Sequence, residues 1–151
     1  MDQTALQQTI AKLAPNAVFN PNPQFIELSV PSMELHQVAK LLKENKETLF
    51  DFLFNQTGLD QKGELRVVYH LRSTALNHTC VLKSTVESRD DANLDTVSDL
   101  WPAAEFFERE IYDLLGVWFN NHPDMRRLFL EDDFVGHPLR KDFVDTVNII
   151  Q

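Results

Sequence analysis

Three successive stretches of this chain alternate between apolar and polar residues, and this pattern is the strongest constraint on its fold. They are residues 49–54, 64–72 and 78–86. A period of two residues is typical of strands with one buried face. The polar stretches 55–63 and 73–77 between them predict hairpin connections. Consecutive strands joined in this way favour an antiparallel sheet with helices covering one face.

The first third of the chain supplies helices that can cover such a sheet. Residues 4–13 predict an amphipathic helix whose capping box starts at Thr4, and residues 32–45 predict a second helix with its first residue as the N-cap. Residues 26–30 alternate as a further strand, and residues 17–19 are a candidate short strand. The expected fold class is therefore α+β: a two-layer sandwich with a largely antiparallel sheet of about four strands covered by helices.

The chain is expected to form a single domain over residues 1–151, because this length suffices for one core and no repeat divides it. We expect the core to comprise about residues 1–116 and an extended C-terminal docking tail to comprise about residues 117–151. The acidic stretch 87–99 predicts an exposed link between the last strand and the next helix.

That next helix is expected from about residue 102 to residue 115, with Gly116 at its C-terminal cap. Its predicted buried stripe contains Glu110 among apolar residues. A buried carboxylate costs several kcal/mol unless it is paired, so we expect a cation or donor from the tail to meet it, with Arg126 as the favoured partner of this helix. The apolar residues of the stripe and the candidate tail partners are Ala103, Phe107, Ile111, Leu114, His122, Arg126, Arg127 and Arg140.

Composition excludes several classes of protein. The chain has 14 Lys and Arg against 23 Asp and Glu, which gives a formal net charge of −9 and a field that repels nucleic-acid phosphates and anionic lipid headgroups. Its apolar runs are far shorter than the ~20 residues of a membrane span. The single cysteine, Cys80, cannot supply the four thiolates of an iron–sulfur cluster, and the four glycines form no nucleotide-binding loop. Without a signal-peptide pattern, we expect a cytosolic protein.

A stand-alone enzyme is the alternative from a different functional class. Glu108, Glu110, Asp113 and His122 would then form an acid–base or metal constellation. Against this hypothesis, Glu108 and Glu110 point to different faces of the predicted helix, and no helical pair of metal ligands occurs.

The spacing of charged residues after residue 107 is distinctive. An acid–base–acid triplet at 108–110 is followed after two residues by Asp113, and His122 and Arg126 follow at fixed distances. This spacing, the run LWPAAEFFERE before it and the closing run GHPLRKDF resemble the 30-kDa, or C-type, subunit family of NADH-quinone oxidoreductase (respiratory complex I). The resemblance covers about residues 49–143. The motif and interface residues that it implies are Glu108, Arg109, Glu110, Asp113, Gly116, His122, Pro123, Arg126, Arg127, Gly136, Pro138, Arg140, Lys141 and Asp142.

The resemblance implies a structural, non-redox subunit in the peripheral arm of a proton-translocating oxidoreductase. Its partners would be the hydrogenase-large-subunit-like (49-kDa or D-type) subunit at the quinone site and cluster-bearing subunits. FMN, iron–sulfur clusters and quinone are expected in those partners, with no catalytic centre, cofactor or metal in this chain. Its expected location is peripheral, on the cytoplasmic side of the inner membrane. Similar subunits occur in membrane-bound hydrogenases and other donor–quinone dehydrogenases, which remain alternatives.

Overall fold

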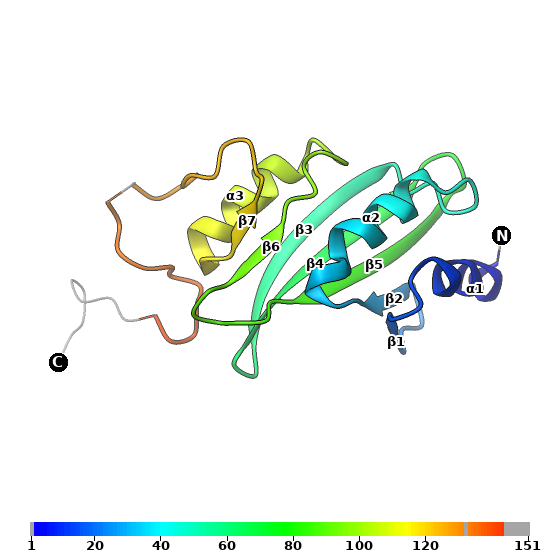
Figure 1. Cartoon of the computed structure of the whole chain (residues 1–151), viewed down its shortest axis with the longest axis horizontal. Helices are drawn as coiled ribbons and strands as arrows, with labels where there is room; N and C mark the ends of the chain where they lie inside the picture. Colours follow the sequence, from blue (N-terminus) through cyan, green and yellow to red (C-terminus); the bar gives the residue numbers. More distant parts are fainter. Residues whose placement is uncertain (1, 132, 144–151) are drawn as a thin grey trace.

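The computed structural model of the chain describes residues 2–131 and 133–143, and it is built in two layers (Figure 1). The sheet has five strands in the order β1-β2-β5-β4-β3. All neighbours pair antiparallel except β2 and β5, which run parallel. The α+β sandwich predicted from the sequence is confirmed, although the sheet is mixed. The strand bounds are β1 Val18–Asn20, β2 Ile26–Ser29, β3 Phe52–Gln61, β4 Glu64–Ser73 and β5 His78–Thr85.

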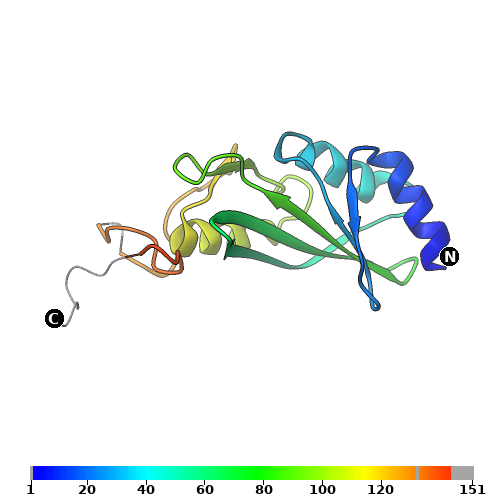
Figure 2. The same ribbon diagram turned by 90° about the horizontal axis from the view of Figure 1, so that it is seen from below.

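Helices cover one face of this sheet. Helix α2 lies across β4 and β5, and α1 lies beside it at the N-terminal end, whereas α3 lies at the opposite end of the molecule (Figures 1 and 2). A short second sheet pairs β6 with β7 in parallel. No helix in the described part of the chain is long and apolar enough to cross a bilayer. The remaining bounds are α1 Gln3–Leu13, η1 Ser32–Glu34, α2 Leu35–Glu44, β6 Asn93–Asp95, α3 Ala104–Leu115 and β7 Trp118–Asn120.

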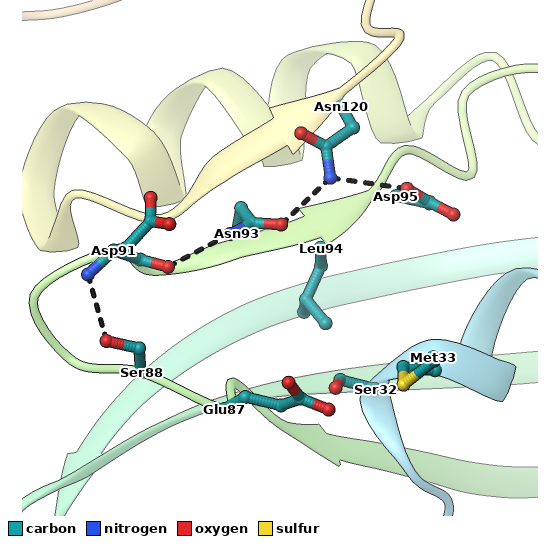
Figure 3. A pocket seen from close by; sticks show the side chains of 9 residues that line it. All are labelled: Ser32, Met33, Glu87, Ser88, Asp91, Asn93, Leu94, Asp95 and Asn120. Carbon is teal, nitrogen blue, oxygen red and sulfur yellow. Dashed lines mark hydrogen bonds between the residues drawn. The ribbon is translucent and has the colours of Figure 1, made fainter.

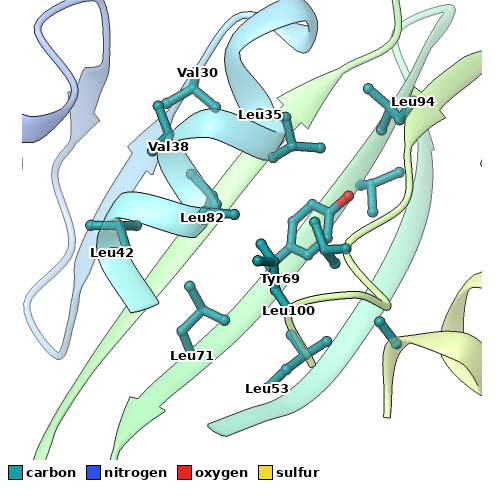
Figure 4. Packing of buried hydrophobic residues seen from close by; sticks show 14 of the residues in the cluster. Val30, Leu35, Val38, Leu42, Leu53, Tyr69, Leu71, Leu82, Leu94 and Leu100 are labelled. Atoms are coloured by element: carbon teal, nitrogen blue, oxygen red, sulfur yellow. The ribbon is translucent and has the colours of Figure 1, made fainter. Parts of the chain in front are cut away.

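The core lies between α2 and the covered face of the sheet (Figure 4). Leu35, Val38 and Leu42 of α2 pack on Tyr69 and Leu82 of the central strands, and all five are buried. Burial of each such side chain contributes about 1.5–3 kcal/mol. This apolar layer fixes the sheet on which the C-terminal elements are placed.

The predicted loop at 55–63 is wrong, because β3 and β4 continue to a two-residue turn at Lys62 and Gly63. Both turn residues have positive φ, 53° and 79°, as in the tight hairpins that match strand twist. The prediction failed because Gln56 and Asp60 are polar yet lie on the buried side of β3. Gly58 lies between them, where any Cβ would overlap Leu115 of α3. The interruption of the alternating pattern in β3 thus marks the place where α3 packs on this strand.

Three smaller predictions are corrected by the structure. The cap of α1 is Asp2, whose Oδ1 accepts a hydrogen bond from Ala5 N at 2.7 Å, instead of a box at Thr4. Ser32 begins a 3-10 turn, so α2 starts only at Leu35. The predicted link at 87–99 contains β6, which pairs with the first residues of the predicted tail, so the extended segment begins after β7.

Candidate functional site

Helix α3 carries the charged motif, and its buried face is rotated from the predicted one. The buried face consists of Ala104, Glu108, Ile111 and Leu115, whereas Glu110 is half-buried and Ala103 is exposed. The prediction that a carboxylate lies on this face is right in kind but wrong in residue. The predicted apolar stripe differs from the buried face because α3 packs on the edge strand β3. At Gly58 the absence of a side chain leaves room for Ile111 and Leu115.

Glu108 is fully buried and meets only neutral donors. Its carboxylate accepts hydrogen bonds from the Thr96 hydroxyl, from Val97 N at 3.0 Å and from Gln56 Nε2 at 3.2 Å. Among the described residues, no Lys, Arg or His pairs with Glu108, and its donors come from β3 and from the segment before α3 rather than from the tail. Burial raises the pKa of Glu108 to about 7, although the three hydrogen bonds oppose the shift.

Asp113, also fully buried, is surrounded by donors from the tail. Its Oδ1 accepts from Arg127 Nη1 at 3.1 Å, and its Oδ2 accepts from the backbone N–H groups of Leu128, Phe129 and Leu130 at 3.3, 2.7 and 3.0 Å. Burial acts to raise the pKa of Asp113, but these hydrogen bonds together lower it. The ionised carboxylate therefore holds the backbone of residues 128–130 of the tail against α3.

Arg127 extends these contacts further along the tail, and we call the contacts of Asp113 and Arg127 with the tail the clamp. Its side chain is only 9% exposed, and its Nη2 donates to the carbonyl oxygens of Phe134 and Gly136 at 3.0 and 2.8 Å. Its guanidinium also lies 5.5 Å from the centre of the Phe134 ring. One arginine thus joins Asp113 to two later points of the tail, and its planar fork suits this role better than lysine.

The end of α3 is satisfied by the tail as well. Arg140 Nε donates to the carbonyl of Leu115 at 2.6 Å, and Leu139 N donates to the carbonyl of Leu114 at 2.8 Å. These carbonyls belong to the last turn of the helix and have no partner within it. A cation at this end also interacts favourably with the helix dipole.

Gly116 ends α3 in the left-handed conformation that the sequence predicted, with φ of 78°. A Cβ at this position would lie 2.5 Å from Cδ2 of His137. The His137 ring is held there by a hydrogen bond between Nδ1 and the Asp113 carbonyl at 3.1 Å, and it lies 5.6 Å from the Tyr112 ring. Burial lowers the pKa of His137, so the ring packs as neutral imidazole.

A second anchor holds the end of the described tail and involves two residues outside the predicted motif. Arg89 donates to both carboxylate oxygens of Asp60 at 2.7 and 2.6 Å, and it pairs with Asp142 at 3.1 Å. Lys141 N also donates to Asp60, at 2.8 Å. The hydrogen bonds from Arg89 are the main cause that lowers the pKa of Asp60 to about 2. Asp60 and Arg89 were missed because both lay in predicted loops.

Arg126 does not make the predicted side-chain contact with α3. Its side chain is 67% exposed and pairs with Asp124 at 3.0 Å, while its backbone carbonyl accepts from Arg109 Nε at 3.2 Å. Arg127 makes the pairing instead. His122 Nε2 contacts the Glu105 carbonyl at 3.0 Å, so it secures the loop after β7 to α3.

The four residues of the enzyme hypothesis have separate surroundings. Glu108 faces Gln56 and Thr96, Asp113 faces the tail, and His122 contacts a backbone carbonyl. Glu110 lines a small recess together with polar residues of β3 and apolar residues of α3. Within residues 2–131 and 133–143, no group of three His, Cys, Asp or Glu side chains could hold a metal ion.

A recess of about 370 Å³ lies outside the motif. It lies where β6 faces the start of η1, and its polar lining includes Glu87, Asp91 and Asp95 (Figure 3). Asn120 of β7 reaches its rim and donates to Asn93 and Asp95 at 3.0 and 3.2 Å. These hydrogen bonds connect β7 with β6 and belong to the short second sheet.

Beyond the clamp, α3, β7 and the tail present apolar side chains to solvent. We call these six residues the apolar rim. Their exposed fractions range from 39% to 88%. Large exposed apolar side chains, where they gather on a surface, are a feature of interaction sites. The apolar rim consists of Phe106, Trp118, Phe129, Phe134, Val135 and Leu139.

The fold and this site define a small α+β domain whose charged helix clamps its own C-terminal tail. Comparison with known proteins identifies the family: residues 28–147 match the family described as respiratory-chain NADH dehydrogenase, 30 Kd subunit, and the chain belongs to it. It is 45% identical over 122 residues to the C/D subunit of NADH-quinone oxidoreductase from Phocaeicola vulgatus, over 80% of this chain but 23% of that protein. The chain thus spans about a quarter of these longer curated relatives.

Two further similarities agree with this family. The C-type subunit of NADH-quinone oxidoreductase from Geobacter sulfurreducens is 39% identical over 122 residues, which are 78% of this chain and 74% of that protein. Among solved structures, a chain of an archaeal respiratory membrane complex, the membrane-bound sulfane sulfur reductase, is 29% identical with a TM-score of 0.80, over 95% of this chain and 86% of that chain. A trypsin-resistant fragment of Nqo5 is 28% identical with a TM-score of 0.64, over 80% and 96%.

Proposed function

We propose that this chain is a structural subunit in the peripheral arm of an NADH-quinone oxidoreductase and carries no redox centre of its own. Family membership supports the complex, and the similarity to the C-type and C/D subunits of NADH-quinone oxidoreductases supports NADH and quinone as its substrates. The partner would be the hydrogenase-large-subunit-like subunit, with cluster-bearing subunits nearby. FMN, iron–sulfur clusters and quinone would then lie in those partners, on the cytoplasmic side of the membrane.

The observation that carries this proposal is the way the charged motif is used inside the chain. Asp113 and Arg127 bind the tail rather than a substrate, and the clamp leaves the apolar rim exposed. A tail that is held by these contacts and has outward apolar side chains fits a docking surface for another protein, because less conformational entropy is lost when the partner binds. Arg126, exposed beside it, is available for a partner's carboxylate.

Surface variants test the proposal without disturbing the clamp. Phe129 and Val135 are 65% and 88% exposed, so Phe129→Asp and Val135→Asp should leave the fold intact and abolish recovery of the assembled complex from native membranes. Met33, 84% exposed near the start of η1 and outside the apolar rim, supplies the matched control Met33→Asp. Normal assembly and NADH-quinone activity with both rim variants would refute the docking role.

An equivalent subunit of another respiratory complex is the second candidate. The similarity to the sulfane sulfur reductase chain extends over 95% of this chain, which exceeds the coverage of the Nqo5 fragment. The two candidates differ in their companions. Copurification with a tagged copy from the native host should recover flavin-containing, NADH-oxidising subunits in the first case and lack them in the second.

A further inference from the structure

The buried carboxylate of Glu108 is connected to the surface by two hydroxyl groups in series. The Thr96 hydroxyl contacts Glu108 and lies 2.8 Å from Ser98 Oγ. Thr96 is 5% exposed, whereas Ser98 is half-buried. We propose that Glu108 is an internal proton-binding site that exchanges its proton with solvent through Thr96 and Ser98. This inference goes beyond the proposed function and does not depend on it.

The geometry of Thr96 satisfies both protonation states of Glu108. With the carboxylate ionised, Ser98 donates its hydroxyl proton to Thr96, and Thr96 donates to Glu108. With the carboxyl protonated, Glu108 donates to Thr96 and Thr96 donates to Ser98 Oγ. In both states Thr96 also accepts from Ser98 N at 3.0 Å. A hydroxyl has one donor and two acceptor sites, so only hydrogens rotate and no buried group loses its partner.

The surroundings favour a proton over a fixed counter-charge at this position. Each element packed around Glu108 contributes a neutral or acidic group: Gln56 from β3, Tyr69 from β4, and Thr96 and Asp99 from the segment before α3. Burial is the main cause that raises the pKa of Glu108, and the charge of Asp99 adds to it. Burial, assisted by Glu108, also raises the pKa of Tyr69 well above its usual value, so Tyr69 stays neutral.

A surface recess of about 280 Å³ lies beside the hydroxyl pair. Thr96 lines this recess together with His36 and Asp99, whose side chains are joined at 2.9 Å. In the transfer, solvent gives a proton to Ser98 Oγ as Ser98 gives its own to Thr96 and Thr96 gives its own to Glu108. Three O–H bonds form and three break, counting the bond in the solvent donor, and one proton is gained by the carboxylate.

The titration of Glu108 in the full chain is the direct test. With glutamate carboxyl carbons labelled by carbon-13, the resonance of Glu108 is assigned as the one lost in Glu108→Gln. We expect it to titrate close to neutral pH, above the usual range of a glutamate carboxyl group. A Glu108 resonance that remains in its ionised position from about pH 5 to pH 9 would overturn the proposal.

Two hydroxyl variants distinguish the relay from simple burial. Thr96→Val removes a donor to the ionised carboxylate and should raise the pKa of Glu108, because hydrogen bonds to a charged group are the stronger ones. Ser98→Ala removes the acceptor that Thr96 needs in the protonated state and should lower this pKa. Each change is expected to alter the proton affinity roughly tenfold, which is one pKa unit.

The matched control is Thr85→Val, a hydroxyl deletion at the end of β5, which should leave the titration unchanged. Shifts of Thr96→Val and Ser98→Ala in the same direction, or no shift with Ser98→Ala, would refute the relay. Ser98 is only half-buried, so Ser98→Ala should fold normally even if Thr96→Val does not. The docking proposal is unaffected by either result, because its variants lie on the apolar rim.

Discussion

Glu108 and Asp113 are two fully buried carboxylates on the same helix, and their surroundings differ in one respect. Glu108 accepts hydrogen bonds from neutral groups of the core, whereas Asp113 accepts from Arg127 and three backbone N–H groups of the tail. The pKa of Glu108 is therefore raised to about 7, and that of Asp113 is lowered. Burial alone does not decide the charge of an acid; the number and charge of its donors do.

Asp113→Asn should have the largest effect of the variants that test this comparison. It leaves the Arg127 guanidinium buried without its counter-charge and weakens three backbone hydrogen bonds to the tail. Removing one partner of a buried ion pair costs about 3–5 kcal/mol. Urea unfolding should show this loss, and hydrogen exchange should show faster exchange at the amides of Phe129 and Leu130.

The control for this prediction is Asp124→Asn, which removes the partner of an exposed arginine. Its effect should stay below about 1 kcal/mol, as for surface ion pairs. If Asp113→Asn were as mild as Asp124→Asn, the clamp would not depend on the carboxylate charge.

Glu108→Gln should change the pH dependence of stability in the opposite sense. The pKa of Glu108 is raised from 4.5 to about 7, so its contribution is fully present below pH 4.5 and is lost as the pH rises towards 7. The loss is on the order of 3 kcal/mol, since one pKa unit corresponds to about 1.4 kcal/mol. Relative to the wild type, Glu108→Gln should therefore gain stability between pH 5 and pH 8, as measured by urea unfolding across this range.

Asp113 provides the internal contrast for that experiment. Because its pKa is lowered below 3.8, its contribution is present above that value and is lost as the pH falls through the folded-state pKa. Asp113→Asn should thus flatten the acid limb of the stability curve and Glu108→Gln the limb between pH 4.5 and pH 7. The same limb changing in both variants would contradict the assignment of charges.

The elements with regular side-chain patterns were predicted from sequence, and the contacts between distant segments were not. The alternation in β4 and β5 and the stop of α3 at Gly116 are local signals, and all three are confirmed. The length of β3 was missed because Gln56 and Asp60 interrupt the alternation, although each has a distant partner, Glu108 or Arg89, that satisfies it within the fold.

In the candidate site, too, the contacts between distant segments were not predicted from the sequence. The sequence predicts a buried carboxylate on α3 and a tail that supplies cations, but it favours Glu110 as the buried acid and Arg126 as the tail partner of the helix. In the structure Asp113 pairs with Arg127. A rotation of the helix by one residue changes which acid is buried, and the period of 3.6 residues leaves this rotation open when several apolar stripes compete. The close packing of Ile111 and Leu115 on Gly58 determines the rotation of α3.

Gly116→Ala tests the C-terminal end of α3, where the tail packs near Asp113 but not near Glu108. Alanine pays a backbone cost at φ of 78°, and its Cβ would displace His137 from the Asp113 carbonyl. We expect a loss of about 1–3 kcal/mol. Gly63→Ala is the matched control, because Gly63 has φ of 79° but nothing within 4 Å of the added Cβ. The difference between the two variants in urea unfolding measures the contact with His137, and equal losses would show that this contact contributes nothing.

Arg126→Ala should have the smallest effect on the isolated chain. The side chain is 67% exposed and its ion pair with Asp124 is local, so the expected change in unfolding free energy is within about 0.5 kcal/mol. Lys83→Ala, which removes a half-buried pair with Glu27 at 3.0 Å, should cost the isolated chain more. We expect the order to reverse for assembly of the complex, because Arg126 lies beside the apolar rim and Lys83 lies on the sheet. Equal assembly of the two variants would show that Arg126 makes no contact with a partner.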